Sequence, residues 1–129
     1  MSIEAAPNTG SILDETKRYL GLTSDYTPFD TQIIICINGA IMTLNQLGIG
    51  TAGFEVTDNS QLWSALAENI GDIQQVKNYI CLKTRMLFDP PVAGYTTNAY
   101  NDVLKEYEWR LMAQSEDLAR SLSLEEDTD

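Results

Sequence analysis

The fold is organised around one stretch of sequence, Val76-Lys-Asn-Tyr-Ile-Cys-Leu-Lys-Thr-Arg-Met-Leu-Phe-Asp-Pro-Pro91. In and just before it, apolar residues recur at helical spacing on two adjacent stripes: Ile73, Val76, Ile80 and Leu87, and Tyr79, Leu82 and Met86. An apolar face of this width must be covered from more than one side. The stretch is therefore predicted to be the central helix, with the other helices packed around it.

The end of this helix is sharply defined. Asp89 precedes a proline, and the residue before a proline is disfavoured from the helical conformation. Pro90 and Pro91 also have no amide hydrogen with which to continue the helix. Phe88 is the last large apolar residue before the break and is expected to anchor the turn in the core. The residues predicted to be largely buried are Trp63, Ile80, Leu87 and Leu104.

The two preceding helices have recognisable ends. Ser11 fits the N-cap of a first helix, which Gly21 is suited to stop. Thr27 followed by Pro28 is a strong start signal for a second helix, because proline is favoured at the first helical position. Apolar residues then keep a helical period as far as Leu47, which predicts a helix from Pro28 to Leu47.

Two further helical segments are predicted. Asp58 or Ser60 can cap a short helix over residues 61–68. A last helix is expected to start with Thr97 as its cap. Its apolar stripe consists of Ala99, Tyr100, Val103, Leu104, Tyr107 and Leu111.

The remaining segments are loops and termini. Residues 48–57 form a glycine-rich loop, and residues 92–98 form a polar linker. From about residue 115 the chain becomes acidic and has too few leucines for a core of its own, which predicts a frayed helix passing into a disordered tail. The chain thus divides into a flexible arm (1–10), a helical domain (11–114) and an acidic tail (115–129).

These elements predict an all-α protein. With 129 residues, 43% of them hydrophobic, the chain has enough material for one core of ordinary size. No internal repeat, second domain or pair of strands is evident. The expected fold is a small bundle of about four to five helices, with a glycine-rich loop and an extended acidic C-terminal tail.

Composition limits the function. The formal net charge is −11, from 19 acidic and 8 basic residues, whereas binding duplex DNA through its phosphates requires clustered Lys and Arg. The N-terminus has neither a basic region nor a long apolar run, so no signal peptide is predicted. No segment is apolar over the length needed to cross a bilayer, and no membrane association is expected.

No catalytic, cofactor-binding or metal-binding residues are predicted. The chain has no histidine, which removes the commonest general base and the commonest metal ligand. Cys36 and Cys81 each lie in an apolar helical pattern and are interpreted as buried, reduced thiols. The adjacent acids fit helix starts, solvated faces or the tail. We therefore expect an interaction protein and not an enzyme.

A series of short motifs extends from about residue 11 to residue 116. Among them are Tyr26-Thr-Pro-Phe-Asp30, Met42-Thr-Leu-Asn-Gln-Leu-Gly48, Gly53-Phe54, Trp63, Leu87-Phe-Asp-Pro-Pro91 and Glu108-Trp-Arg-Leu111. Their order and spacing together resemble the head–tail connector (adaptor) proteins of tailed bacteriophages. The acidic tail extends past the similar region.

This resemblance implies a structural virion protein. It implies a homo-oligomeric ring, a dodecamer, that sits under the portal protein at the neck of the virion after synthesis in the host cytoplasm. Such a ring extends the DNA channel and provides the platform for a stopper or tail-completion protein. Genomic DNA would pass through without sequence-specific binding, and negative walls would let it slide.

Two other functions are compatible with the composition. One is an acidic helical adaptor that binds a cellular partner through an apolar groove. The other is a small helix-turn-helix regulator, which predicts a basic recognition helix. The best candidate for that helix, residues 76–87, is too apolar to be exposed.

Candidate assembly contacts follow from the loops and the tail. The loop 48–57 and the linker 92–98 are polar enough to be exposed, yet they contain Phe54, Val56 and Tyr95. In the tail, the apolar residues are Leu118, Leu122 and Leu124. The tail is expected either to dock on a partner or to stay as a solvated fringe.

Overall fold

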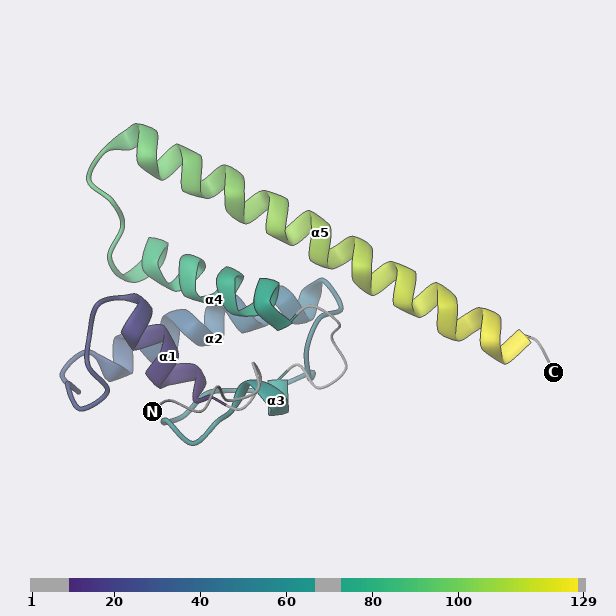
Figure 1. Ribbon diagram of the computed structural model, residues 1–129, viewed down its shortest axis with the longest axis horizontal. Helices are drawn as coiled ribbons and strands as arrows, with labels where there is room; N and C mark the ends of the chain where they lie inside the picture. The colour runs from purple at the N-terminus through teal and green to yellow at the C-terminus, as the bar shows by residue number, and fades with distance from the viewer. Residues whose placement is uncertain (1–9, 67–72, 128–129) are drawn as a thin grey trace, which may run out of the picture.

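A computed structural model describes residues 10–66 and 73–127, with side chains up to Arg120 except at Leu118. The expected arm lies outside these residues, apart from Gly10, as do residues 67–72 and 128–129. The described helices are α1 (Ile12–Tyr19), α2 (Asp30–Gln46), α3 (Trp63–Leu66), α4 (Ile73–Phe88) and α5 (Gly94–Asp127). Beyond an isolated bridge between Ser11 and Leu62, no strand pairing occurs in this part of the chain. The all-α prediction is confirmed (Figure 1).

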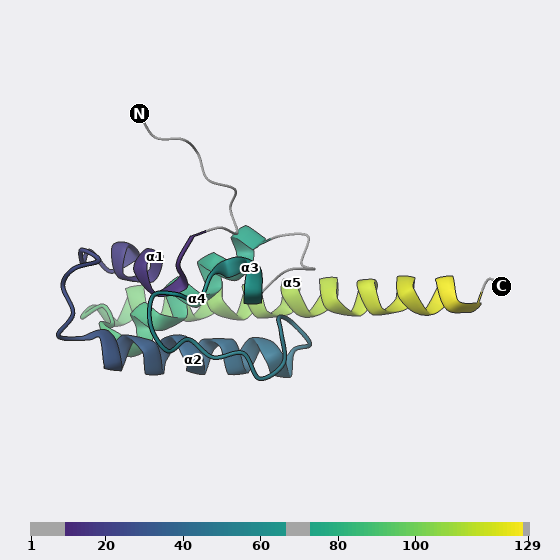
Figure 2. The same cartoon turned by 90° about the horizontal axis from the view of Figure 1, so that it is seen from below.

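The central position of α4 is also confirmed. It packs against α1, α2 and α5, and its side chains Val76, Tyr79 and Ile80 are fully buried. Figure 2, which is turned by 90° from Figure 1, shows α5 running alongside the other helices. Between α4 and α5, the Tyr79 hydroxyl donates a hydrogen bond of 2.7 Å to Glu108.

One core prediction for α4 is wrong. Trp63, Ile80 and Leu104 are buried as expected, but Leu87 is 55% exposed. The buried row on α4 advances in steps of four, through Ile80 and the fully buried Thr84. Each such step turns about 40° further around the helix than one full turn, so the row drifts away from Leu87. Phe88 instead contacts the body, with its ring centroid 5.6 Å from that of Phe29.

The ends of α1 agree with the sequence, whereas the start of α2 does not. The Ser11 hydroxyl accepts a hydrogen bond of 3.2 Å from the Asp14 amide, and Gly21 follows the helix with a φ of +85°. The second helix begins at Asp30 and not at Pro28. The residues before it form a turn, in which the Asp30 amide donates to the Thr27 carbonyl at 3.1 Å, and Asp30 forms an ion pair of 2.8 Å with Lys17 of α1.

The loop between α2 and α3 is held against the bundle by one side chain. Asn38 of α2 donates to the Val56 carbonyl at 2.9 Å and accepts from the Val56 amide at 2.8 Å. Before α3, the Asp58 carboxylate accepts from the Ser60 amide at 2.8 Å, which closes a turn and does not cap the helix. The described helix is Trp63–Leu66, and the last two residues of the expected range 61–68 lie outside the described residues.

The last helix is longer than expected at both ends. It begins at Gly94, so Thr97 lies within its first turn, where its amide donates to the Ala93 carbonyl at 3.1 Å. It continues as far as Asp127, through most of the segment expected to be a disordered tail. The Ser115 hydroxyl donates to the Gly48 carbonyl at 3.2 Å, and beyond this point the helix projects from the body (Figure 1). The division of the chain into a helical domain (11–114) and a distinct acidic tail (115–129) remains a prediction.

These burial differences predict unequal effects of two leucine substitutions. Leu104→Ala is expected to lower the free energy of unfolding by about 2–5 kcal/mol, because the side chain is 4% exposed and leaves a cavity. Leu87→Ala is expected to cost less than about 1 kcal/mol, because much of that side chain is already in water. Urea denaturation of both variants checks this, and equal losses would place Leu87 in the core after all.

Candidate interaction surfaces

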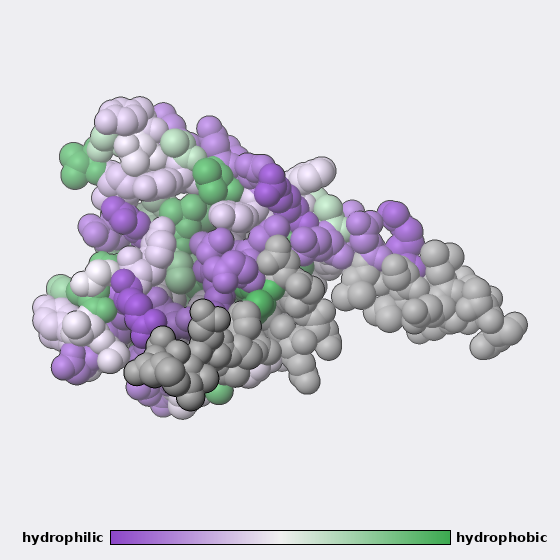
Figure 3. Space-filling model, viewed as in Figure 1, coloured by the Kyte–Doolittle hydropathy of each residue, from purple (hydrophilic) through white to green (hydrophobic). Residues whose placement is uncertain are grey.

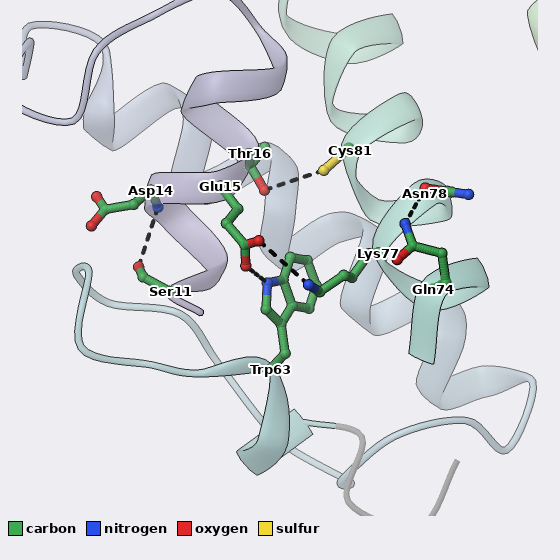
Figure 4. A network of polar contacts seen from close by, with 9 residues as sticks. All are labelled: Ser11, Asp14, Glu15, Thr16, Trp63, Gln74, Lys77, Asn78 and Cys81. Carbon is green, nitrogen blue, oxygen red and sulfur yellow. Dashed lines mark hydrogen bonds and ion pairs between the residues drawn. The ribbon is translucent and has the colours of Figure 1, made fainter. Parts of the chain in front are cut away.

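A polar cluster fixes three helices relative to one another (Figure 4). The Trp63 indole N–H donates to the Glu15 carboxylate, and the Lys77 ammonium lies 3.4 Å from the same carboxylate. The ammonium also lies 5.5 Å from the centroid of the Trp63 ring, within the range of a cation–π interaction. Burial of Trp63 was predicted from the sequence, but its two polar partners, from α1 and α4, were not.

A buried lysine fixes the loop between α1 and α2. Lys17 is 1% exposed, and its ammonium contacts Asp30 at 2.8 Å and donates to the Ser24 carbonyl at 3.0 Å. A buried ammonium is costly unless it is paired and hydrogen-bonded, and here it is both. Lys17 of α1 thereby holds the loop at Ser24 and the start of α2 at Asp30.

An apolar groove lies next to this loop, where α1 and α4 end and α2 begins. Its volume is about 740 Å³. Most of its lining is apolar, from Leu20, Leu22, Phe29, Ile35, Leu87 and Phe88. Ile35 is 66% exposed, and Gln32, Cys36 and Asp89 supply the polar part of the lining. The surface is suited to an apolar partner segment.

Two further exposed apolar side chains lie in the link between α4 and α5 and just after it. Val92 and Tyr95 are fully or largely exposed in this link and at the start of α5. Figure 3 shows separate hydrophobic patches on the left of the body, with hydrophilic residues between them, and others over its middle. Scattered exposed apolar side chains are ordinary, so the groove itself is the stronger candidate for an interaction site.

The predicted contact residues fall into three groups. Tyr95 is exposed on the first turn of α5, and Phe54 is half-buried against the core. Val56 is 1% exposed, so its side chain belongs to the core of the subunit and is not on its surface. The backbone at Leu118, Leu122 and Leu124 is helical, and their side chains lie outside those that the structure describes.

Sequence reasoning missed the groove residues. The sequence predicts Leu87 as a core residue and places Phe29 in the first turn of a helix. A usable signal was present, because Leu87 lies in the last turn before two prolines, where a helix loses the neighbours that would cover it. Ile35 lies in a run of five apolar residues on one helix, and not all of them can face the core.

Both cysteines are free thiols in different surroundings. Cys81 is buried, with its sulfur 3.8 Å from the Thr16 hydroxyl, and burial raises the pKa of the Cys81 thiol to about 11. Cys36 lines the groove, is partly exposed, and also has a thiol pKa raised by burial. Partial exposure makes Cys36 the more accessible thiol of the two.

This difference predicts the order of cysteine modification. At pH 8 a maleimide should react at least about tenfold faster with Cys36 than with Cys81, because a thiol of pKa about 11 is thiolate in only roughly one molecule in a thousand. Mass spectrometry of the digested protein at successive times checks the order. In urea both thiols should react at similar rates, and equal rates in the folded protein would contradict the burial of Cys81.

No metal site or membrane-spanning helix occurs in the described ranges. Over residues 10–66 and 73–127, no cluster of three or more His, Cys, Asp or Glu side chains is placed to hold a metal ion. The helices of the same ranges are too short or too polar to span a membrane.

The chain was compared with known proteins. A family model described as phage connector protein matches residues 12–117, from the start of α1 to just past the point where α5 leaves the body. Searches of curated proteins and of solved structures gave no match. The family match covers most of the chain and agrees with the resemblance of the sequence motifs. The chain therefore belongs to the phage connector protein family.

Proposed function

We propose that this protein is the subunit of a ring, with twelve copies, that sits under the portal at the neck of a phage virion. The ring extends the DNA channel and provides the platform on which a stopper or tail-completion protein assembles. Its role is structural and not enzymatic. The observation that carries the proposal is the phage connector match over residues 12–117.

The charge of the protein supports a position along the DNA path. A net charge of −11 per subunit gives a twelve-copy ring a strongly negative surface. Lys and Arg contacts to phosphate would hold DNA, whereas a negative wall lets it slide. DNA would therefore pass through the channel without being bound.

The distribution of surfaces supports a ring. A closed ring of identical subunits requires each copy to present two different surfaces, one to each neighbour. The groove at the ends of α1 and α4 and the projecting part of α5 are two such different surfaces. The exposed Tyr95 and the half-buried Phe54 are proposed as further assembly contacts.

The proposal is tested by mixing the purified protein with a portal protein from the same phage. Light scattering after size-exclusion chromatography should give a complex whose mass corresponds to twelve subunits for each portal ring. Electron microscopy should then place the added density below the portal. Failure to bind the portal, or binding as isolated subunits without a ring, would contradict the proposed function.

A tyrosine variant tests the link between α4 and α5 as a contact. Tyr95→Ser is expected to weaken assembly on the portal at least about tenfold, because a largely exposed aromatic side chain in an interface commonly carries more than 1 kcal/mol of the binding energy. Val103→Ser, at a 39% exposed position on the same helix, is the matched control. Normal tail joining and DNA retention by Tyr95→Ser particles would exclude this contact.

A further inference from the structure

The C-terminal part of α5 has no described packing partner within its own subunit. The hydrogen bond from Ser115 to Gly48 is the last one between α5 and the body among the side chains that the structure describes. Glu116, Asp117 and Arg120 are all exposed. Both views show the helix continuing past the body (Figures 1 and 2). Residues 116–127 amount to about 18 Å of helix, at about 1.5 Å per residue.

The apolar stripe of α5 continues into this projecting part. Leu104 and Leu111, seven residues apart, are the positions that the body buries. Leu118 follows after another seven residues and Leu122 after four more, which keeps the same helical register. A helix of about twelve residues is marginal in water unless its apolar side is covered. The projecting part is therefore suited to packing on a second body.

The groove lies at the opposite end of the subunit. It is formed where α1 and α4 end and α2 begins, on the left of the body in Figures 1 and 2, whereas α5 projects to the right. The projecting helix therefore points away from its own groove. In a row of equally oriented copies, it points toward the groove of the next.

Charge distribution favours the same pairing. Residues 116–127 contain five acidic side chains and one basic one in sequence, at Glu116, Asp117, Glu125, Glu126, Asp127 and Arg120. Lys83 lies one turn before the groove residue Leu87, is partly exposed, and has no carboxylate partner among the ion pairs of the described residues. Arg18 lines a different pocket, beside Trp63 and Lys77, and the Nε atom of Arg85 is buried. Asp89 is the acidic residue in the lining of the groove.

We propose that residues 116–127 of one copy dock as a helix in the groove between α1, α2 and α4 of the neighbouring copy. The proposal rests on the proposed ring and specifies how adjacent subunits join. The apolar stripe would enter the groove, and the acids would lie near Lys83. Because the two surfaces differ and lie at opposite ends, the contact is head to tail and can close into a ring.

A cross-linking experiment in the full chain tests the proposal, because Cys36 already lines the groove. Ala119→Cys places a second thiol on the projecting helix, at an exposed position. A short bismaleimide should then join copies through Cys36 and residue 119 and give a ladder of covalent oligomers. Asn101→Cys, exposed on the part of α5 beside the body, is the matched control and should give less than about a tenth of the product. Adding Cys36→Ser should abolish the ladder.

Charge introduced in the groove provides a second measurement. Leu87→Glu should remove the cross-link while changing the urea midpoint little, as is expected of Leu87→Ala, because this side chain is 55% exposed. Leu62→Glu, at a 38% exposed position outside the groove, should cross-link normally. A ladder that persists in Leu87→Glu, or the absence of any cross-link to Cys36, overturns the proposal.

The outcomes separate this inference from the proposed function. Rings that assemble on the portal without a link between residue 119 and Cys36 would overturn the docking proposal and leave the ring intact. Covalent oligomers through these two positions, with no binding to the portal, would support the docking contact and contradict the neck function. A protein that is monomeric and uncross-linked with and without the portal contradicts both.

Discussion

Replacing Trp63 with alanine is expected to lower the free energy of unfolding by about 3–5 kcal/mol, among the largest losses for any single side chain of this protein. Trp63 is fully buried, so its removal leaves a large cavity where α1, α3 and α4 meet. The substitution also removes the hydrogen-bond donor of Glu15 and the ring beneath Lys77. A partly buried carboxylate that loses a partner adds to the cost of the cavity.

The other tryptophan of the chain provides the control. Trp109 lies on α5 and is 65% exposed, so Trp109→Ala is expected to cost less than about 1 kcal/mol. Far-UV circular dichroism during urea unfolding is the suitable measurement, because both substitutions change the fluorescence directly. Similar losses for the two variants would show that the cluster of Glu15, Trp63 and Lys77 does not organise the fold.

Trp63→Phe separates the cavity from the polar cluster. Phenylalanine retains most of the apolar contact but cannot donate to Glu15. We expect an intermediate loss of about 1–3 kcal/mol, because the partly buried Glu15 loses one of its two partners and keeps only Lys77. A loss equal to that of Trp63→Ala would mean that packing of the second ring, and not the hydrogen bond, carries the stability.

The sequence predicted the two ends of α1 correctly, because interactions within the helix and its caps determine them. The Ser11 cap and the Gly21 stop lie where the sequence places them, because each satisfies groups within one turn of itself. The start of α2 differs by two residues from the prediction, and its first residue, Asp30, pairs with Lys17 of α1. A contact between two helices leaves no signal in the local sequence pattern.

The groove could not be predicted for a related reason. The apolar pattern of α4 includes Leu87 in the stripe predicted to be buried. It does not include Thr84, which is polar but fully buried. The direction in which the buried row drifts depends on how α4 crosses its neighbours, and the sequence of α4 alone does not contain that angle. Val56 illustrates the opposite error, because a loop residue is in the core when a distant side chain, Asn38, holds its backbone there.

The second large effect is expected from truncation after Ser115. The shortened chain should fold with a loss of less than about 1 kcal/mol, because it keeps the buried Leu104 and Leu111 and the hydrogen bond from Ser115 to Gly48. It should nevertheless lose self-association and tail joining completely, because it lacks the helix proposed to enter the neighbouring groove. Urea denaturation and light scattering measure the two properties on one sample.

A full-length variant with Leu118→Ser and Leu122→Ser shows which feature of the segment matters. It keeps the length and all the charges of the projecting helix but interrupts its apolar stripe. If docking in the groove joins the subunits, this variant should fail to assemble as the truncated chain does, because charges exposed to solvent contribute little on their own. A chain that lacks only residues 128–129 is the control and should assemble normally.

A truncated chain that folds and joins tails like the full chain would show that residues 116–129 have no docking role. A truncated chain that fails to fold would place these leucines in the core of their own subunit.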